Sequence, residues 1–195
     1  MANIDRVNGF KPVQHLSGSP YTGKGMKCYK AAGTTVTHDL FVGDMVVTSG
    51  SGDTAGVMGV LIATAGTGNV SCGVIQAIEF NADHLDRANW IDGADAGYVF
   101  VCVDPTVVYE AQANASLTYT DIGKNAPMVQ TAAGSRTAGT SGQEVNATVS
   151  DTATDQLKII GFVQRPDNEI AAADTKVLVI INNHEFGGGT GNAGH

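Results

Sequence analysis

The sequence predicts an all-β protein, a β-sandwich or barrel with a jelly-roll-like layout of about eight strands. Val and Thr supply 40 of the 195 residues, whereas the chain has only 7 Leu and 5 Glu, so β-branched residues far outnumber strong helix formers. Apolar runs of strand length alternate with clusters of Gly, Pro, Asn and Asp. With 43% apolar residues, the chain has enough apolar surface to form a buried core.

Eight segments have the length and composition of strands. They cover residues 26–29, 44–49, 57–65, 70–80, 97–103, 106–111, 157–164 and 175–182. Gly66-Thr67-Gly68-Asn69 separates the two longest apolar runs and predicts a hairpin turn between them, because glycine readily adopts a positive φ. Asp104-Pro105 predicts a bend between two strands, and the Gly50–Gly56 segment predicts a hairpin loop.

The remaining segments predict an organisation in three parts. Residues 1–25 are poor in apolar side chains and read as an extended N-terminal arm, followed by a β domain over 26–186. Within that domain we expect a short helix near 81–90 and a long loop over 131–155 with one weak strand near 144–149. Residues 187–195 form a Gly-rich tail, which we expect to be flexible because it has no apolar anchor.

Charge and cysteine content narrow the class of protein. The net charge of −8 argues against binding to nucleic acid or to anionic membranes. No apolar run is long enough for a membrane span, and the N-terminus lacks the apolar segment of a signal peptide. Cys28, Cys72 and Cys102 are odd in number and two lie in strand-like runs, so we expect synthesis in a reducing cytoplasm and no structural disulfide.

Two glycine-rich segments resemble nucleotide-binding loops only in part. Gly18-Ser19-Pro20-Tyr21-Thr22-Gly23-Lys24 matches a phosphate-binding loop, but Gly25 stands where Ser or Thr would hold magnesium, and a strand follows instead of a helix. The segment from Gly50 to Gly56 has the wrong spacing for a dinucleotide fingerprint. We therefore expect no nucleotide and no other cofactor.

Catalytic and metal-binding patterns are missing from the sequence as well. The five His are scattered without the spacing of a metal motif, and His184 and Glu185 would point to opposite faces of a strand. Five of the 14 Asp lie beside Gly, Asn or Pro, where a carboxylate bonds nearby backbone amides. We expect a protein that is not an enzyme and holds no metal.

Three groups of residues carry a resemblance to a known class of protein. They are Asn8-Gly9-Phe10-Lys11-Pro12-Val13 with Leu16-Ser17-Gly18-Ser19-Pro20-Tyr21, Leu40-Phe41-Val42-Gly43-Asp44-Met45-Val46-Val47 with Gly56-Val57-Met58-Gly59-Val60-Leu61, and Ile160-Gly161-Phe162-Val163-Gln164-Arg165-Pro166-Asp167-Asn168-Glu169 with Val177-Leu178-Val179-Ile180-Ile181-Asn182-Asn183-His184-Glu185-Phe186. Together they resemble the capsid decoration, or cement, proteins of tailed bacteriophages. The similarity spans most of the chain, although residues 110–155 contribute little and the Gly-rich tail matches no element of the family.

The resemblance implies a structural virion protein, made in the host bacterial cytoplasm and placed on the outer surface of an icosahedral head, where it bridges neighbouring copies of the major capsid protein. It also implies a homo-oligomer, a trimer or else a dimer, which fits an arm with few apolar side chains. We expect Phe10, Pro12 and Tyr21 to anchor the arm on a neighbouring subunit, with packing on their own domain as the alternative of equal weight. The rival function is a head-fibre or tail module that recognises host-surface glycans, for which one Trp and five Tyr give thin support.

Overall fold

The computed structural model describes residues 3–33, 38–131 and 133–187, and these residues are almost entirely strands and turns. The strands are β1 (Lys11–His15), β2 (Met26–Lys30), β3 (Leu40–Phe41), β4 (Met45–Gly52), β5 (Met58–Ile62), β6 (Gly73–Ile78), β7 (Trp90–Ile91), β8 (Gly97–Cys102), β9 (Val107–Gln112), β10 (Asn125–Ala126), β11 (Met128–Gln130), β12 (Gln143–Val145), β13 (Leu157–Phe162) and β14 (Lys176–Ile181). One 3-10 turn, Tyr119–Asp121, precedes β10. All eight predicted strands are confirmed, and the additional ones are mostly short.

In this part of the chain no helix has the length and apolar character of a membrane span.

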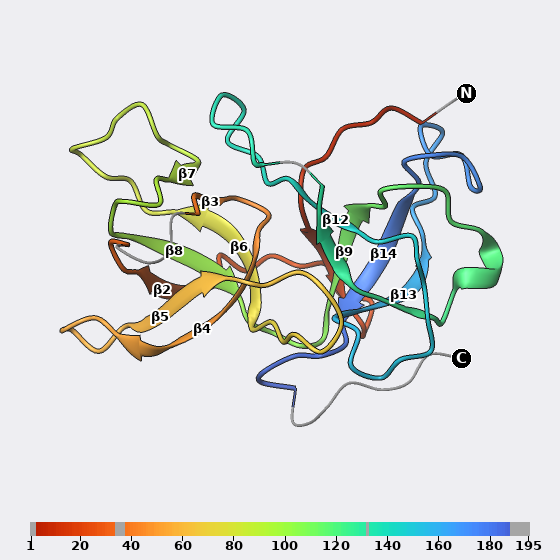
Figure 1. Ribbon diagram of the computed structural model, residues 1–195, viewed down its shortest axis with the longest axis horizontal. Helices are drawn as coiled ribbons and strands as arrows, with labels where there is room; N and C mark the ends of the chain where they lie inside the picture. Colours follow the sequence, from red (N-terminus) through yellow and green to blue (C-terminus); the bar gives the residue numbers. More distant parts are fainter. Residues whose placement is uncertain (1–2, 34–37, 132, 188–195) are drawn as a thin grey trace.

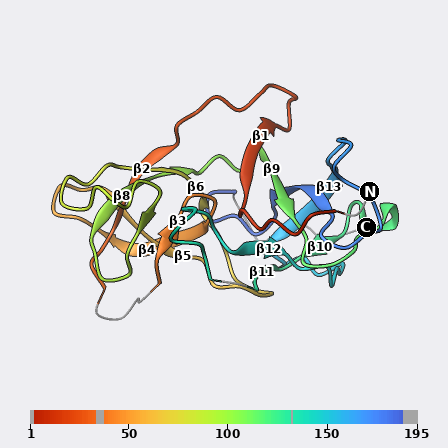
Figure 2. The same cartoon turned by 90° about the horizontal axis from the view of Figure 1, so that it is seen from above.

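The strands form two assemblies that lie side by side (Figures 1 and 2). Strands β2-β5-β4-β6-β8 close into a barrel, and strands β1-β9-β14-β13-β10 form an open five-stranded sheet. The short pairs β3-β7 and β11-β12 complete the fold. The all-β architecture predicted from composition is therefore confirmed.

Each assembly has its own apolar core. Alternate residues of β9, β13 and β14 enter the larger core, which also receives Met45, Val74 and Cys102 from the barrel strands. The smaller core fills the barrel with Cys28, Leu40, Val46, Val60, Cys72, Ile75, Ile91, Val99 and Val101. All three cysteines are buried and unpaired. Their buried positions agree with their strand-like sequence context.

The predicted hairpin around Gly66-Thr67-Gly68-Asn69 is wrong. Gly66 and Gly68 do adopt positive φ angles of 111° and 86°, but the strands on either side do not pair with each other. Strand β4 lies between β5 and β6 and pairs with both. The local turn signal indicated where the chain bends, whereas the strand order depends on long-range pairing. The hairpin predicted between Gly50 and Gly56 is confirmed, because β4 and β5 are antiparallel neighbours.

The helix expected at 81–90 is also replaced, here by a series of turns. The side chain of Asn81 accepts the Asp83 N–H at 2.9 Å, and the backbone carbonyls of Asn81 and His84 accept the N–H groups of His84 and Arg87. Asn and Asp side chains compete in this way with helical hydrogen bonding. Within 131–155 the described residues hold one strand, β12, and residues 188–195 of the Gly-rich tail lie outside the described part.

The N-terminal segment crosses the barrel at a contact between two glycines. Phe10 donates its N–H to the Gly43 carbonyl at 2.9 Å, and Gly43 in turn donates to the Ile75 carbonyl of β6 at 2.9 Å. Gly9 has a φ of 63°, and a Cβ there would lie 2.4 Å from the Gly43 oxygen. Only glycine fits this position, because both the backbone conformation and the available space exclude a side chain.

Replacing Gly9 by Ala should therefore destabilise the protein strongly, by about 3 kcal/mol or more. Gly50→Ala is the matched control, because Gly50 also has a positive φ but an added Cβ would meet nothing within 4 Å. Gly50→Ala should lower the free energy of unfolding by only about 1 kcal/mol. Chemical denaturation of both variants measures the difference, and equal costs would show that the crossing tolerates a side chain.

A buried carboxylate stands next to this crossing, at the start of β4. Asp44 is 1% exposed, and its Oδ2 accepts the Phe41 N–H at 2.8 Å. Its Oδ1 has no hydrogen-bond partner among the residues that the structure describes. Burial raises the pKa of Asp44 from 3.8 to about 7, because the charged form loses its solvation.

Because the pKa of Asp44 is higher in the folded protein, the folded state binds this proton more tightly than the unfolded state does. The free energy of unfolding therefore falls as the pH rises from 3.8 to about 7. Asp44→Asn should remove this effect while keeping an oxygen for the Phe41 N–H. The unfolding free energy of the wild type should fall relative to the variant by up to about 1.4 kcal/mol per pH unit across this range. Burial lowers the pKa of His184, so its titration makes the free energy of unfolding rise with pH. This contribution is the same in both proteins and cancels in the comparison. A difference that does not change with pH would contradict the prediction.

Candidate interaction site

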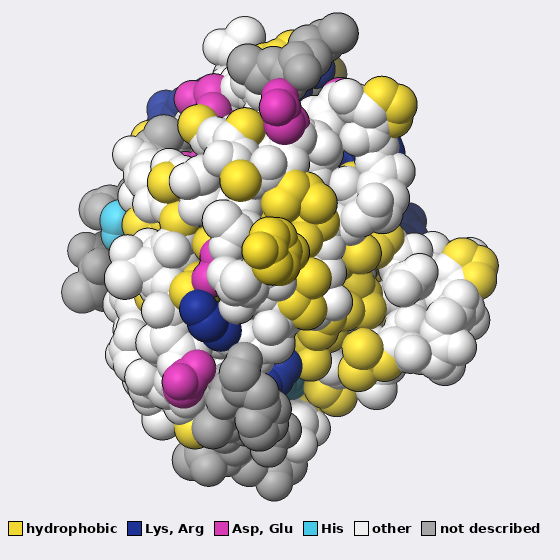
Figure 3. Space-filling model, turned by 90° about the vertical axis from the view of Figure 1, so that its right-hand side faces the viewer, with side chains coloured by type: hydrophobic (Ala, Val, Ile, Leu, Met, Phe, Trp, Pro, Cys, Tyr) yellow, Lys and Arg dark blue, Asp and Glu magenta, His cyan; other side chains and the backbone are white. Residues whose placement is uncertain are grey.

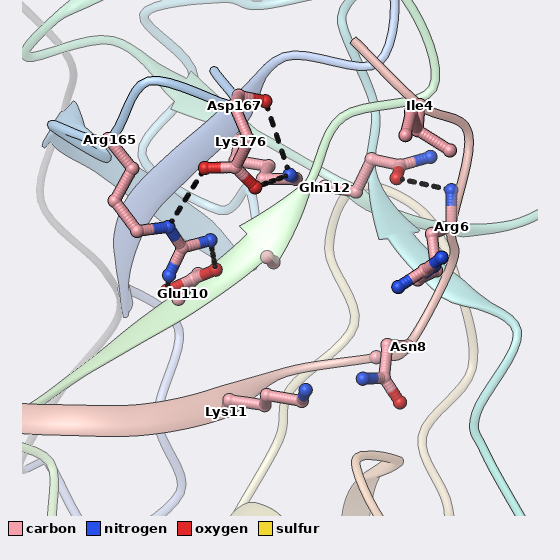
Figure 4. A pocket seen from close by; sticks show the side chains of 11 residues that line it. Ile4, Arg6, Asn8, Lys11, Glu110, Gln112, Arg165, Asp167 and Lys176 are labelled. Atoms are coloured by element: carbon pink, nitrogen blue, oxygen red, sulfur yellow. Dashed lines mark hydrogen bonds and ion pairs between the residues drawn. The ribbon is translucent and has the colours of Figure 1, made fainter.

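A groove opens where the N-terminal segment separates from β9 (Figure 4). Residues 4–11 form one wall, and β9, the start of β14 and the turn after β13 form the other. Its volume is 270 Å³, and its lining includes Ile4, Arg6, Asn8, Lys11, Glu110, Gln112, Arg165, Asp167 and Lys176. This is close to the lower limit of small-ligand sites, at about 300 Å³, and the groove is open along its length.

Hydrogen bonds from Gln112 fix the N-terminal wall of the groove. Its Oε1 accepts the Arg6 N–H at 2.9 Å, and its Nε2 donates to Asp5 Oδ1 at 2.9 Å and to Glu144 at 3.2 Å. Further along, the Asn3 side chain bonds the backbone of Glu169 and Ala173. The wall is therefore held in place before any partner binds.

The opposite wall carries a chain of ion pairs. Arg165 donates to both carboxylate oxygens of Glu110 at 2.6 and 2.9 Å, and to Asp167 at 3.2 Å. Lys176 donates to Asp167 at 2.6 Å, and this hydrogen bond is the main reason why the pKa of Asp167 is lowered. Because Arg165 and Asp167 are exposed to solvent, these ion pairs orient the wall more than they stabilise the fold.

Two further cations in the groove have no such partner. The side chains of Arg6 and Lys11 make no ion pair or hydrogen bond with any described residue, and both are exposed on the N-terminal wall (Figure 4). The lining thus contains four cations and two carboxylates, a net charge of +2, whereas the whole chain has a net charge of −8. The groove is a local site of attraction for carboxylates.

An apolar sheet face adjoins the groove. On β14, Val177, Val179 and Ile181 enter the larger core, while Lys176, Leu178 and Ile180 alternate on the opposite face. Ile160 of β13 lies on the same outer face by alternation, and Leu178, Ile180 and Ile160 are all half-buried and outside both core clusters. Val108 of β9, in contrast, is fully buried and is not part of the accessible face. Leu178 pairs in register with Glu110, so the apolar face continues directly into the groove.

The surface of this end of the molecule is also rich in hydrophobic side chains. Hydrophobic side chains gather into a continuous band on the end formed by the five-stranded sheet, with few charges inside the band (Figure 3). Tyr119 and Ile122, near the 3-10 turn, and Ile170 are also exposed. A large exposed apolar patch with a polar rim is typical of a surface that binds another protein.

The predicted anchors Phe10, Pro12 and Tyr21 do not form one exposed patch. Phe10 is 1% exposed in the larger core, so its assignment as an anchor for a partner is corrected: the core of its own chain takes the ring. Pro12 is half-buried on β1, opposite Tyr109. Tyr21 is half-buried against the larger core and tilts against the His15 ring at 5.8 Å, and burial together with Cys102 raises its pKa. The predicted arm is therefore partly a strand of the sheet.

Sequence reasoning missed Arg6, Lys11 and the outer sheet face. Single basic residues carry no motif, and the outer residues of β14 lie in the continuous apolar run Val177-Leu178-Val179-Ile180-Ile181, which reads as wholly buried. The alternation of buried and half-buried positions appears only in the structure. The described residues contain no group of three or more His, Cys, Asp or Glu side chains that could hold a metal ion.

Comparison with known proteins gives no further assignment. No protein-family model matches the chain, no curated protein matches it, and no solved structure matches its fold.

Phe10→Ala should cost about 3–5 kcal/mol of stability, because it leaves a large cavity in the core. Val13→Ala is the control, since Val13 lies on the same strand but is exposed, and its cost should stay below about 1 kcal/mol. Thermal and chemical unfolding of both variants test this. A Phe10→Ala protein as stable as the Val13→Ala protein would mean that Phe10 lies outside the core in solution.

Proposed function

We propose that this chain is a structural virion protein that binds the outer surface of an icosahedral phage head and joins neighbouring copies of the major capsid protein. The observation that carries the proposal is the outer face of the five-stranded sheet together with the cationic groove beside it. The resemblance to phage decoration proteins, carried by residues 8–21, 40–61 and 160–186, supplies the partner.

The sheet face suits a stable contact with another protein. It is broad, its side chains are held by strand pairing, and Leu178, Ile180 and Ile160 would be removed from water on binding. A contact of ordinary size buries about 1,600 Å² in total, and many symmetry-related copies would multiply its effect on the particle. Such a clamp needs no chemical step.

The charges give the contact its orientation. Arg6 and Lys11 would pair with carboxylates of the capsid surface, while the apolar residues beside them supply most of the binding energy. The overall charge of −8 favours the exterior of the head, because packaged DNA would repel an acidic protein on the inner wall. A homotrimer, or else a dimer, matches the symmetry axes of an icosahedral shell.

Adding the purified protein to undecorated phage heads tests the proposal. We expect it to cosediment with the heads, and decorated heads should retain their DNA at temperatures that open undecorated ones. Failure to bind would contradict the proposal, and binding without added resistance to heat would remove the stabilising role.

Reversing both unpaired groove charges, with Arg6→Glu and Lys11→Glu together, should weaken binding to heads at least tenfold without lowering the melting temperature by more than a few degrees. For the control, the single reversal Lys11→Glu is compared with Lys24→Glu, which makes the same change in net charge at an exposed cation outside the groove. Equal loss of binding in these two single variants would indicate a general charge effect rather than a site at the groove.

A further inference from the structure

A second surface feature lies on the outer wall of the barrel, formed by β2 and β8 (Figure 2). Four of the chain's six Phe, five Tyr and one Trp lie on or beside this wall: Tyr29, Phe80, Tyr98 and Phe100. Phe80 is 66% exposed, and the other three are half-exposed. In contrast, Trp90 is 8% exposed, so the single Trp takes no part in this surface.

The aromatic side chains surround a shallow hollow of 330 Å³. Its lining includes Tyr29, Tyr98 and Phe80 together with Glu79 and Asn81. Tyr29 and Tyr98 stand opposite each other in the antiparallel register of β2 and β8, with ring centroids 5.5 Å apart and planes tilted by 52°. The Tyr98 hydroxyl donates to Asp53 Oδ2 at 2.7 Å, so its ring is held in place from the neighbouring β4–β5 loop.

Three polar groups at the hollow retain hydrogen-bonding capacity. The Tyr29 hydroxyl and the Asn81 Nδ2 bond to no described residue, whereas Asn81 Oδ1 already accepts the Asp83 N–H. Glu79 pairs with Lys27 at 2.8 and 2.9 Å, which leaves each carboxylate oxygen able to accept once more. The hollow therefore offers a hydroxyl, an amide donor and a carboxylate acceptor beside aromatic surfaces.

The charges at this wall balance locally. Glu79 is neutralised by Lys27, and Lys27 also lies 4.1 Å from the Tyr98 ring centroid. A ligand that fits must be neutral, must present a flat C–H face to the aromatic rings and must carry several hydroxyl groups at its edge. Pyranose rings have this combination.

We propose that the hollow formed by Tyr29, Phe80 and Tyr98, with Glu79 and Asn81 at its rim, is a binding site for neutral oligosaccharides. The site lies on the barrel, away from the groove and the apolar sheet face, so both surfaces are available at once. It is independent of the proposed capsid contact and would give the protein a second, weak binding function for surface glycans.

Titration with cellohexaose, chitohexaose and maltohexaose, followed through the aromatic ring signals by NMR, tests the site. We expect at least one of the three to shift the signals of Tyr29, Tyr98 and Phe80 while leaving Tyr119 unchanged, because Tyr119 is exposed elsewhere. Tyr29→Ala should weaken binding about tenfold. Tyr29→Phe, which keeps the ring, should lose less and serves as the variant that preserves folding, and Tyr119→Ala should bind as the wild type does.

Several outcomes would overturn the proposal. They are no shift with any of the three oligosaccharides, equal losses in Tyr29→Ala and Tyr119→Ala, or shifts at the hollow with a proline-rich peptide but not with sugars. Head binding by Tyr29→Ala should equal that of the wild type, so failure of this site is distinguishable from failure of the capsid contact.

Discussion

The backbone crossing of Gly9 over Gly43 is the constraint on which the rest of the structure depends. It lets the N-terminal segment approach the turn before β4 closely enough for the Phe10 N–H to bond the Gly43 carbonyl, and it places the Phe10 ring in the larger core. After Phe10 the chain enters β1 and pairs with β9, while residues 4–9 diverge from β9. The groove is the space that this divergence leaves.

The barrel and the open sheet are joined by more than this crossing. The loop after β11 reaches the barrel through Arg136, which pairs with Asp39 at 2.7 Å and lies over the Trp90 ring, with Arg87 also 4.9 Å from the ring centroid. Lys30 closes the nearby end of the barrel by donating to the carbonyls of Gly93 and Asp95. These contacts favour a rigid body, which lowers the entropic cost of binding at the exposed surfaces.

The two proposed binding surfaces differ in chemistry because different kinds of side chain line them. The sheet face carries a row of half-buried aliphatic residues, beside cations held on a separate segment. The barrel wall combines aromatic rings with polar groups whose charges already balance. A protein contact and a sugar contact need these two kinds of surface respectively, and a decoration protein with both would link the capsid to surroundings outside the particle.

The sequence by itself determined the fold class, the eight main strands and the hairpin at Gly50–Gly56, because strand-length apolar runs and turn-forming residues act within a few positions of one another. It also indicated the buried state of Cys72 and Cys102. Tertiary structure alone decided that β4 lies between β5 and β6, that Phe10 enters the core, and that residues 81–90 form turns. It likewise decided which residues stand opposite each other: Lys11 is in register with Glu110, and Tyr29 with Tyr98, through pairing between strands distant in sequence. The apolar alternation of each strand selects a register only after the fold has brought the two strands together, because burial of one face is what discriminates between alignments.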